Sequence, residues 1–130
     1  MTDHAFKVED PYLWPFWEAA SERRLTVQHC RACGAHQFYP RPFCLSCEGR
    51  DLDWVDVAGT GEVYSVTTVR IPVSDLLPPP YQVALVTLDA GPRLLAGIDG
   101  PPCRIGDRVR LVWREREDAP PFPAFERVTP

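Results

Sequence analysis

The chain has 130 residues, about the size of one domain, and its 45% hydrophobic and 25% charged residues are ordinary for a globular protein. Its formal net charge of -4 argues against nucleic acid as a partner, because affinity for phosphates comes from clustered Lys and Arg. The first nine residues contain no apolar run, so we expect no secretory signal, no transmembrane helix, no membrane partner and a cytoplasmic location.

A short amphipathic helix is the first predicted element, within residues 10–25. Pro15 suits a first helical turn, where its missing N–H would have no intrahelical partner. Four apolar residues follow the spacing of one helical face: Leu13, Phe16, Trp17 and Ala20.

Aromatic residues are concentrated in this helix beyond what a small core needs, and aromatics are enriched at interface anchors. The sequence therefore predicts that part of one cluster binds a partner chain: Tyr12, Leu13, Trp14, Phe16 and Trp17. The alternative is that the helix packs on the chain's own next segment. The sequence leaves both readings open.

Two Cys-x-x-Cys pairs lie in the next segment, which has little that could form an apolar core unaided: Cys30 and Cys33, then Cys44 and Cys47. The two-residue spacer lets both sulfurs of a pair face one centre, and we expect Gly34 and Gly49 to supply left-handed backbone angles to the tight turns. Four thiolates complete a tetrahedron and leave no position for water. One structural Zn²⁺ is therefore the predicted cofactor.

Other readings of the cysteines remain. Iron in the same cage would make a rubredoxin-like electron carrier, which spacing alone does not exclude. A dithiol redox pair is less favoured, because it would use one Cys-x-x-Cys near a βαβ unit. We expect His29 and His36 to lie around the metal or on the surface rather than to bind it. The fifth cysteine, Cys103, is predicted to be a small packing residue.

Beyond the cysteines, apolar and polar residues alternate in short runs that predict strands: 61–71, 81–88, 93–98 and 108–114. Turn signals lie at 89–92 and 105–107, whereas the proline-rich segments 72–80 and 120–123 are expected to be connectors. Four or five antiparallel strands would leave two bare edges unless they closed. We therefore predict a small OB-like barrel.

The run 108–114 has two distinct faces, because side chains alternate along a strand. The face predicted to enter the core contains Val109, Leu111 and Trp113, and the opposite face contains Arg108, Arg110 and Arg114. An arginine face is usually solvated. The alternative is contact with a phosphate-bearing ligand such as coenzyme A, or with an acidic partner surface.

Catalytic motifs are not apparent in the sequence. The three histidines are His4, His29 and His36, so the predicted barrel contains none. Neither a Gly-x-Ser-x-Gly elbow nor a phosphate-binding glycine loop occurs. We expect the chain not to be an enzyme by itself and assign it no catalytic residue.

The predicted protein is mainly β: a tail and helix over 1–25, a rubredoxin-like zinc ribbon over 26–52, and an OB-fold barrel over 53–130. Three motifs occur in this order: Pro15-Phe16-Trp17-Glu18, the two cysteine pairs, and Gly61-Glu62-Val63-Tyr64-Ser65. Together they resemble the family of small acyl-CoA-associated proteins with a zinc ribbon and an OB-fold, often encoded beside thiolase-like enzymes.

The resemblance implies a non-catalytic subunit that docks onto a thiolase-like or hydratase-like catalytic subunit and helps to form its acyl-CoA site. In that family the partner carries out thiolase, synthase or steroid side-chain aldolase chemistry. Two alternatives come from other classes: a single-stranded nucleic-acid binder, since OB barrels do this, and the rubredoxin-like electron carrier. The acidic balance of the chain counts against the first of these.

Overall fold

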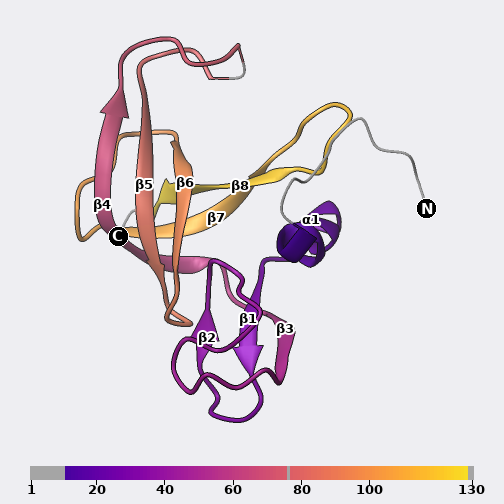
Figure 1. Cartoon of the computed structure of the whole chain (residues 1–130). Helices are drawn as coiled ribbons and strands as arrows, with labels where there is room; N and C mark the ends of the chain where they lie inside the picture. The colour runs from indigo at the N-terminus through magenta and orange to yellow at the C-terminus, as the bar shows by residue number, and fades with distance from the viewer. Residues whose placement is uncertain (1–10, 76, 129–130) are drawn as a thin grey trace.

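The computed structural model describes residues 11–75 and 77–128 of the chain. Over these residues a short helix and a small sheet are followed by a barrel (Figure 1). The elements are, in chain order, η1 (Pro11–Leu13), α1 (Trp14–Ser21), β1 (Thr26–Cys30), β2 (His36–Gln37), β3 (Leu52–Asp56), β4 (Thr60–Val69), β5 (Tyr81–Leu88), β6 (Arg93–Asp99), β7 (Arg108–Arg114) and β8 (Phe122–Arg127).

The predicted helix is present but shorter than the segment 10–25. A 3-10 turn precedes α1, and Pro15 lies in its first turn as predicted. The helix ends before Arg23, whose φ of 59° is left-handed, while the N–H of Arg24 donates back to the carbonyl of Ala19 at 3.0 Å. The side chains that α1 buries are Phe16, Ala19 and Ala20.

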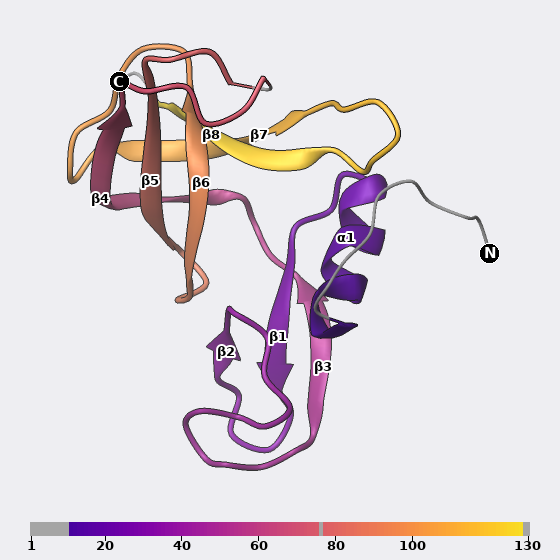
Figure 2. The same ribbon diagram turned by 45° about the horizontal axis from the view of Figure 1, so that its top comes forward.

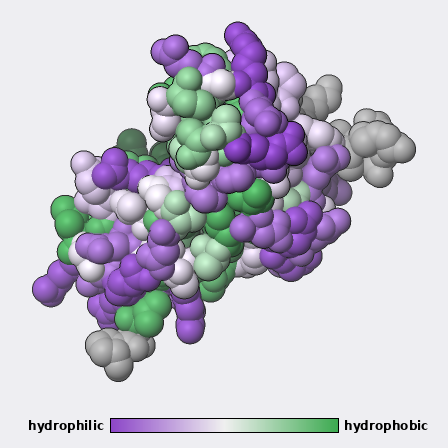
Figure 3. Space-filling view, turned by 90° about the horizontal axis from the view of Figure 1, so that it is seen from below, coloured by the Kyte–Doolittle hydropathy of each residue, from purple (hydrophilic) through white to green (hydrophobic). Residues whose placement is uncertain are grey.

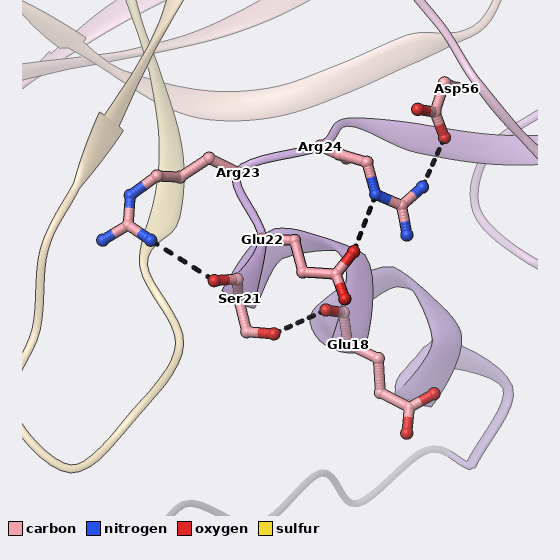
Figure 4. A network of polar contacts seen from close by, with 6 residues as sticks. All are labelled: Glu18, Ser21, Glu22, Arg23, Arg24 and Asp56. Carbon is pink, nitrogen blue, oxygen red and sulfur yellow. Dashed lines mark hydrogen bonds and ion pairs between the residues drawn. The ribbon is translucent and has the colours of Figure 1, made fainter.

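Polar contacts hold the end of α1 against the sheet (Figure 4). Arg24 donates to Glu22 at 2.9 Å and to Asp56, at the end of β3, at 2.6 Å. Arg23 donates to the carbonyl of Ser21 at 3.3 Å. These groups are exposed, so they fix the direction in which the chain leaves the helix rather than supply much stability.

β1 is the central strand of a three-stranded antiparallel sheet in the described residues, ordered β2-β1-β3. Its residues pair with β2 at Gln28 and His29, and with β3 from Thr26 to Cys30. Leu25 and Val27 are buried beneath α1 and contribute to the core. β3 spans the boundary expected between residues 52 and 53, so the ribbon sheet includes residues up to Asp56.

The described strands β4 to β8 close into a barrel in the order β4-β5-β6-β8-β7, with β7 returning to β4. Closure removes the bare edges, as predicted from the strand pattern. Alternate residues point inward, so β5 buries Ala84, Val86 and Leu88. Phe125 of β8 is fully buried among them. Predicted turns occur at 89–91 and 105–106, and 72–75 forms part of a loop.

Two expectations about the barrel were wrong. Residues 120–123 were expected to be a connector, but β8 begins at Phe122 and pairs with β7 along its length. The strands were also expected to be all antiparallel, whereas β6 and β8 are parallel. The parallel pairing with β6 begins only at Ala124, so Pro123 has a strand partner on the β7 side alone. Pro123 has no N–H to donate and is therefore tolerated at this position.

α1 lies between the ribbon sheet and the β7–β8 hairpin (Figure 2). The guanidinium of Arg116, in that hairpin, lies 5.2 Å from the ring centre of Trp17 and 4.9 Å from that of Phe122. Arg23 donates two hydrogen bonds to the carboxylate of Glu115. The helix thereby connects ribbon and barrel.

The face of the molecule seen from below carries small groups of apolar residues between polar ones (Figure 3). None of the described helices is long and apolar enough to cross a bilayer.

Candidate metal centre

The first cysteine pair lies at the end of β1. Cys30 is the last residue of that strand, and the chain turns back so that the N–H of Gly34 donates to the Cys30 carbonyl at 2.8 Å. Gly34 has a φ of 82°, the left-handed angle predicted for it. The N–H of Cys30 also donates to the carbonyl of Ala35 at 2.8 Å, which closes the turn and directs the Cys33 side chain toward Cys30.

The second pair repeats this turn with one difference. The N–H of Glu48 donates to the Cys44 carbonyl at 2.8 Å, and the N–H of Cys44 donates to the Gly49 carbonyl at 2.7 Å. The left-handed residue is Glu48, with a φ of 67°, so the prediction for Gly49 was wrong. Gly49 is favoured for another reason: a Cβ there would lie 3.3 Å from the Cys47 sulfur.

The four sulfurs form one cluster, with all ligand atoms within 4.8 Å of one another. Two pairs, Cys30 with Cys47 and Cys33 with Cys44, are 3.6 Å apart. A tetrahedron with Zn–S bonds of about 2.3 Å has S–S edges of about 3.8 Å, whereas a disulfide needs about 2.05 Å. The cysteines are free thiols and their arrangement fits a metal ion.

Backbone amides surround the cluster. The N–H of Ser46 donates to the Cys44 sulfur at 3.3 Å, and the N–H of Gly49 donates to the Cys47 sulfur at 3.4 Å. The pKa of Cys44 is lowered to about 6, chiefly by the backbone N–H of Cys47. For Cys33, the N–H of Ala35 lowers the pKa, but hydrogen bonds to neighbouring thiols and burial outweigh it and raise the pKa to about 12. Cys44 therefore loses its proton more readily than Cys33 on becoming a thiolate ligand.

The ribbon histidines take other partners. His29 Nδ1 lies 2.9 Å from a carboxylate oxygen of Asp53, and the rings of His29 and His36 are 5.0 Å apart. Arg31 pairs with Asp51 beside them. Four thiolates fill the tetrahedral coordination of a zinc ion and leave no position for water, so the site is closed and structural. Zinc bound there would hold the two turns together without activating water.

The sequence did not predict Gln28 and Gln37, which are buried in the sheet beside the second pair at 5% and 8% exposure. Their side chains form hydrogen bonds to the backbone of Arg41, Phe43 and Leu45. Cys103, by contrast, lies where it was expected, buried in the core, and burial raises the pKa of its thiol.

The aromatic residues of the helix have different surroundings. Phe16 is only 3% exposed, and its ring lies 5.2 Å from that of Phe38 in the ribbon. Trp17 packs against the same core and lies under Arg116. Tyr12 is 49% exposed. The structure therefore divides the cluster between the chain's own core and its surface.

The arginines of β7 are also divided. Arg108 forms two hydrogen bonds to Asp89 at 3.0 and 2.7 Å; these bonds, with one from Thr60, lower the pKa of Asp89 to about 2. Arg110 pairs with Glu126.

Arg114 pairs with Asp99 and is the one β7 arginine at a pocket of about 550 Å³. Arg70, Tyr81 and prolines of the 72–80 loop line the same pocket.

The sulfur cage and the closed barrel together define a zinc-ribbon and OB-fold protein. Family profiles agree: residues 17–53 match the rubredoxin-like zinc ribbon domain of ChsH2, and residues 54–114 match its C-terminal OB-fold domain. The chain belongs to the ChsH2/DUF35 family, and its cysteine cluster is a structural zinc site.

Among relatives, a "Probable enoyl-CoA hydratase alpha subunit" of Thermomonospora curvata is 41% identical over 119 residues, covering 88% of this chain and 37% of that protein. The chain thus spans well under half of that relative. A "DUF35 domain-containing scaffold protein" of Pyrococcus furiosus is 35% identical over 106 residues, covering 77% of this chain and 76% of that one.

A chain of the solved structure "Ltp2-ChsH2(DUF35) aldolase" superposes with a TM-score of 0.87 at 35% identity, over 95% of this chain and all of that one. A DUF35 protein of Sulfolobus solfataricus shares the fold, with a TM-score of 0.65 at 18% identity over 91% of this chain and 86% of that one.

Proposed function

We propose that this chain is a non-catalytic scaffold subunit of an acyl-CoA enzyme that forms or cleaves carbon–carbon bonds. The observation that carries the proposal is the likeness, over 95% of the chain, to a ChsH2(DUF35) chain of an aldolase complex. In the proposal, a thiolase-like or hydratase-like partner supplies the catalytic residues. The complex would work in the cytoplasm, where reducing conditions keep thiols available for zinc.

The chemistry of the described residues supports a non-catalytic role. A closed tetrathiolate zinc site cannot activate water, because it has no open coordination position. The barrel sequence contains no histidine, the commonest general base. The carboxylates of Asp89, Asp99 and Glu126 are paired with arginines.

We propose that the exposed part of the aromatic cluster docks the partner. Tyr12 offers about half of its surface, while Leu13, Trp14 and Trp17 are partly buried and border it. Phe16 belongs to the core and is left out of this docking surface. Rigid aromatic side chains beside a stable helix are well suited to be interface anchors, since they lose little conformational entropy on binding.

We further propose that acyl-CoA is shared with the partner at the pocket beside Arg114. Its volume of about 550 Å³ is in the usual range for small-molecule sites. Arg70 would offer positive charge to a phosphate, and Arg114 would do so by exchanging its ion pair with Asp99, which lines the same pocket. Tyr81 and the prolines would offer apolar walls. Arg108 and Arg110 do not line this pocket, so they are not part of this proposed contact.

The test is co-expression with a thiolase-like or hydratase-like gene product encoded beside this chain, followed by size-exclusion chromatography and acyl-CoA turnover assays. The expected result is a stable complex whose activity needs both chains. Tyr12→Ala should weaken the complex, whereas Ile105→Ala, at a residue 69% exposed on the barrel, should not. Turnover of acyl-CoA by this chain alone would refute the proposal.

A further inference from the structure

Two buried glutamines face each other at the centre of the ribbon sheet. Gln28 of β1 and Gln37 of β2 are register partners, exposed by only 5% and 8%. A buried amide costs free energy unless its polar atoms are hydrogen-bonded. The side chain of Gln37 donates to the oxygen of Gln28 at 2.8 Å, which joins the two amides into one unit.

The two amides also form hydrogen bonds to one backbone segment, residues 41–45. Gln28 accepts from the N–H of Arg41 at 2.8 Å and donates to the carbonyl of Arg41 at 3.0 Å. Gln37 accepts from the N–H of Leu45 at 3.0 Å and donates to the carbonyl of Phe43 at 3.1 Å. Gln37 therefore binds the chain immediately before and immediately after Cys44.

The segment 38–51 has no helix or strand, so it lacks the ladder bonds that fix a backbone elsewhere. The amide pair replaces them over residues 41–45, which lead into the second cysteine turn. Cys44 is 1% exposed, and its sulfur lies 3.6 Å from that of Cys33 on the other turn. A shift of the backbone at Phe43 or Leu45 would move this sulfur directly.

We infer that Gln28 and Gln37 are positioning residues for the zinc centre, which hold the second cysteine turn in its ligating geometry through the backbone on both sides of Cys44. The sulfur of Cys44 then meets the metal in a prearranged position, and the metal does not have to order the whole segment alone. This inference rests on the zinc site and not on the proposed subunit function, so either can fail without the other.

The test is zinc affinity of Gln37→Met, which keeps side-chain length but removes all three hydrogen bonds. The matched control is Gln82→Met, because the Gln82 amide binds the N–H and the carbonyl of Cys103 in the barrel, at 2.7 and 3.1 Å. Zinc affinity is measured in competition with a chromophoric chelator. Gln37→Met should lower this affinity by about 10- to 100-fold, the usual effect of removing a group that orients a metal ligand. Gln82→Met should leave zinc affinity within about threefold.

Folding and metal binding are coupled, so any weakening of the ribbon lowers zinc affinity to some degree. Val27→Ala provides a ribbon control, since Val27 is 1% exposed in the core and its side chain has no polar atom that could hydrogen-bond to either cysteine turn. The discriminating readout is alkylation of the zinc-loaded proteins, followed residue by residue with mass spectrometry. Relative to the parent protein, Gln37→Met should accelerate the reaction of Cys44 and Cys47 about tenfold more than that of Cys30 and Cys33.

In Val27→Ala the alkylation rates of all four cysteines should rise by a similar factor relative to the parent protein. Equal acceleration of both pairs in Gln37→Met, or zinc affinity unchanged from the parent protein, would overturn the inference. If Gln37→Met does not fold, the milder Gln37→Asn is used, with the same selective reaction of the second pair expected and the same outcomes refuting it.

Discussion

Replacing Phe16 with alanine separates the core role of the aromatic helix from its docking role. An aromatic side chain buries about 150–250 Å², which at about 25 cal/mol per Å² corresponds to roughly 4–6 kcal/mol. Phe16 is 3% exposed, so nearly all of this burial free energy applies to it. The methyl group of the alanine would retain a small part of the buried area. We expect Phe16→Ala to lower the free energy of unfolding by about 3–5 kcal/mol.

The assay is equilibrium unfolding in guanidinium chloride with zinc in excess, followed by far-UV circular dichroism. Tyr12→Ala is the matched control, because Tyr12 is 49% exposed on the preceding 3-10 turn. This variant should stay within about 0.5 kcal/mol of the parent. If Phe16→Ala were as stable as Tyr12→Ala, the ring would not be part of the core and the division of the cluster would be wrong.

Three further outcomes are expected. Gly61→Ala would place a Cβ 2.4 Å from a β5 carbonyl oxygen and should lower the free energy of unfolding by about 1–3 kcal/mol, measured by thermal unfolding. Gly97→Ala is the control, because its nearest contact would be at 3.8 Å, and it should leave that free energy unchanged. Equal effects of the two variants would contradict this packing. Because Arg108 and Thr60 hold the pKa of Asp89 near 2, below its usual 3.8, the stabilisation is present above that usual value and is lost as pH falls toward 2. Asp89→Asn should therefore flatten the acid limb of the stability curve, and an unchanged limb would refute the pairing. Removing zinc with a chelator should abolish amide protection in β1 to β3 while β4 to β8 keep theirs in hydrogen exchange; uniform loss would show that the barrel cannot stand alone.

The parts of the fold that the sequence predicted are those with a strong local signal. Paired cysteines constrain their own geometry, and the sulfurs of Cys30 and Cys44 do meet in one cluster. The alternation in Arg108–Arg114 also placed Val109 in the core correctly, because side-chain direction in a strand follows from sequence position alone.

The missed features depend on contacts distant in sequence. β8 contains Pro123, which reads locally as a connector, and only its pairing with β6 and β7 makes it a strand. Gln28 and Gln37 are polar residues that a pattern of hydrophobicity assigns to the surface. Their burial depends on the backbone of residues 41–45, whose path no local signal in the sequence specifies.

The place of β8 in the barrel bears on how the protein is made. The ribosome delivers β8 after the other four barrel strands, yet it lies between β6 and β7 in the finished sheet. Without β8 the barrel cannot close between β6 and β7, and its core lacks the buried ring of Phe125. The ribbon strands end at Asp56 and are made before β8, so we expect the ribbon to be able to bind its ion before the barrel closes.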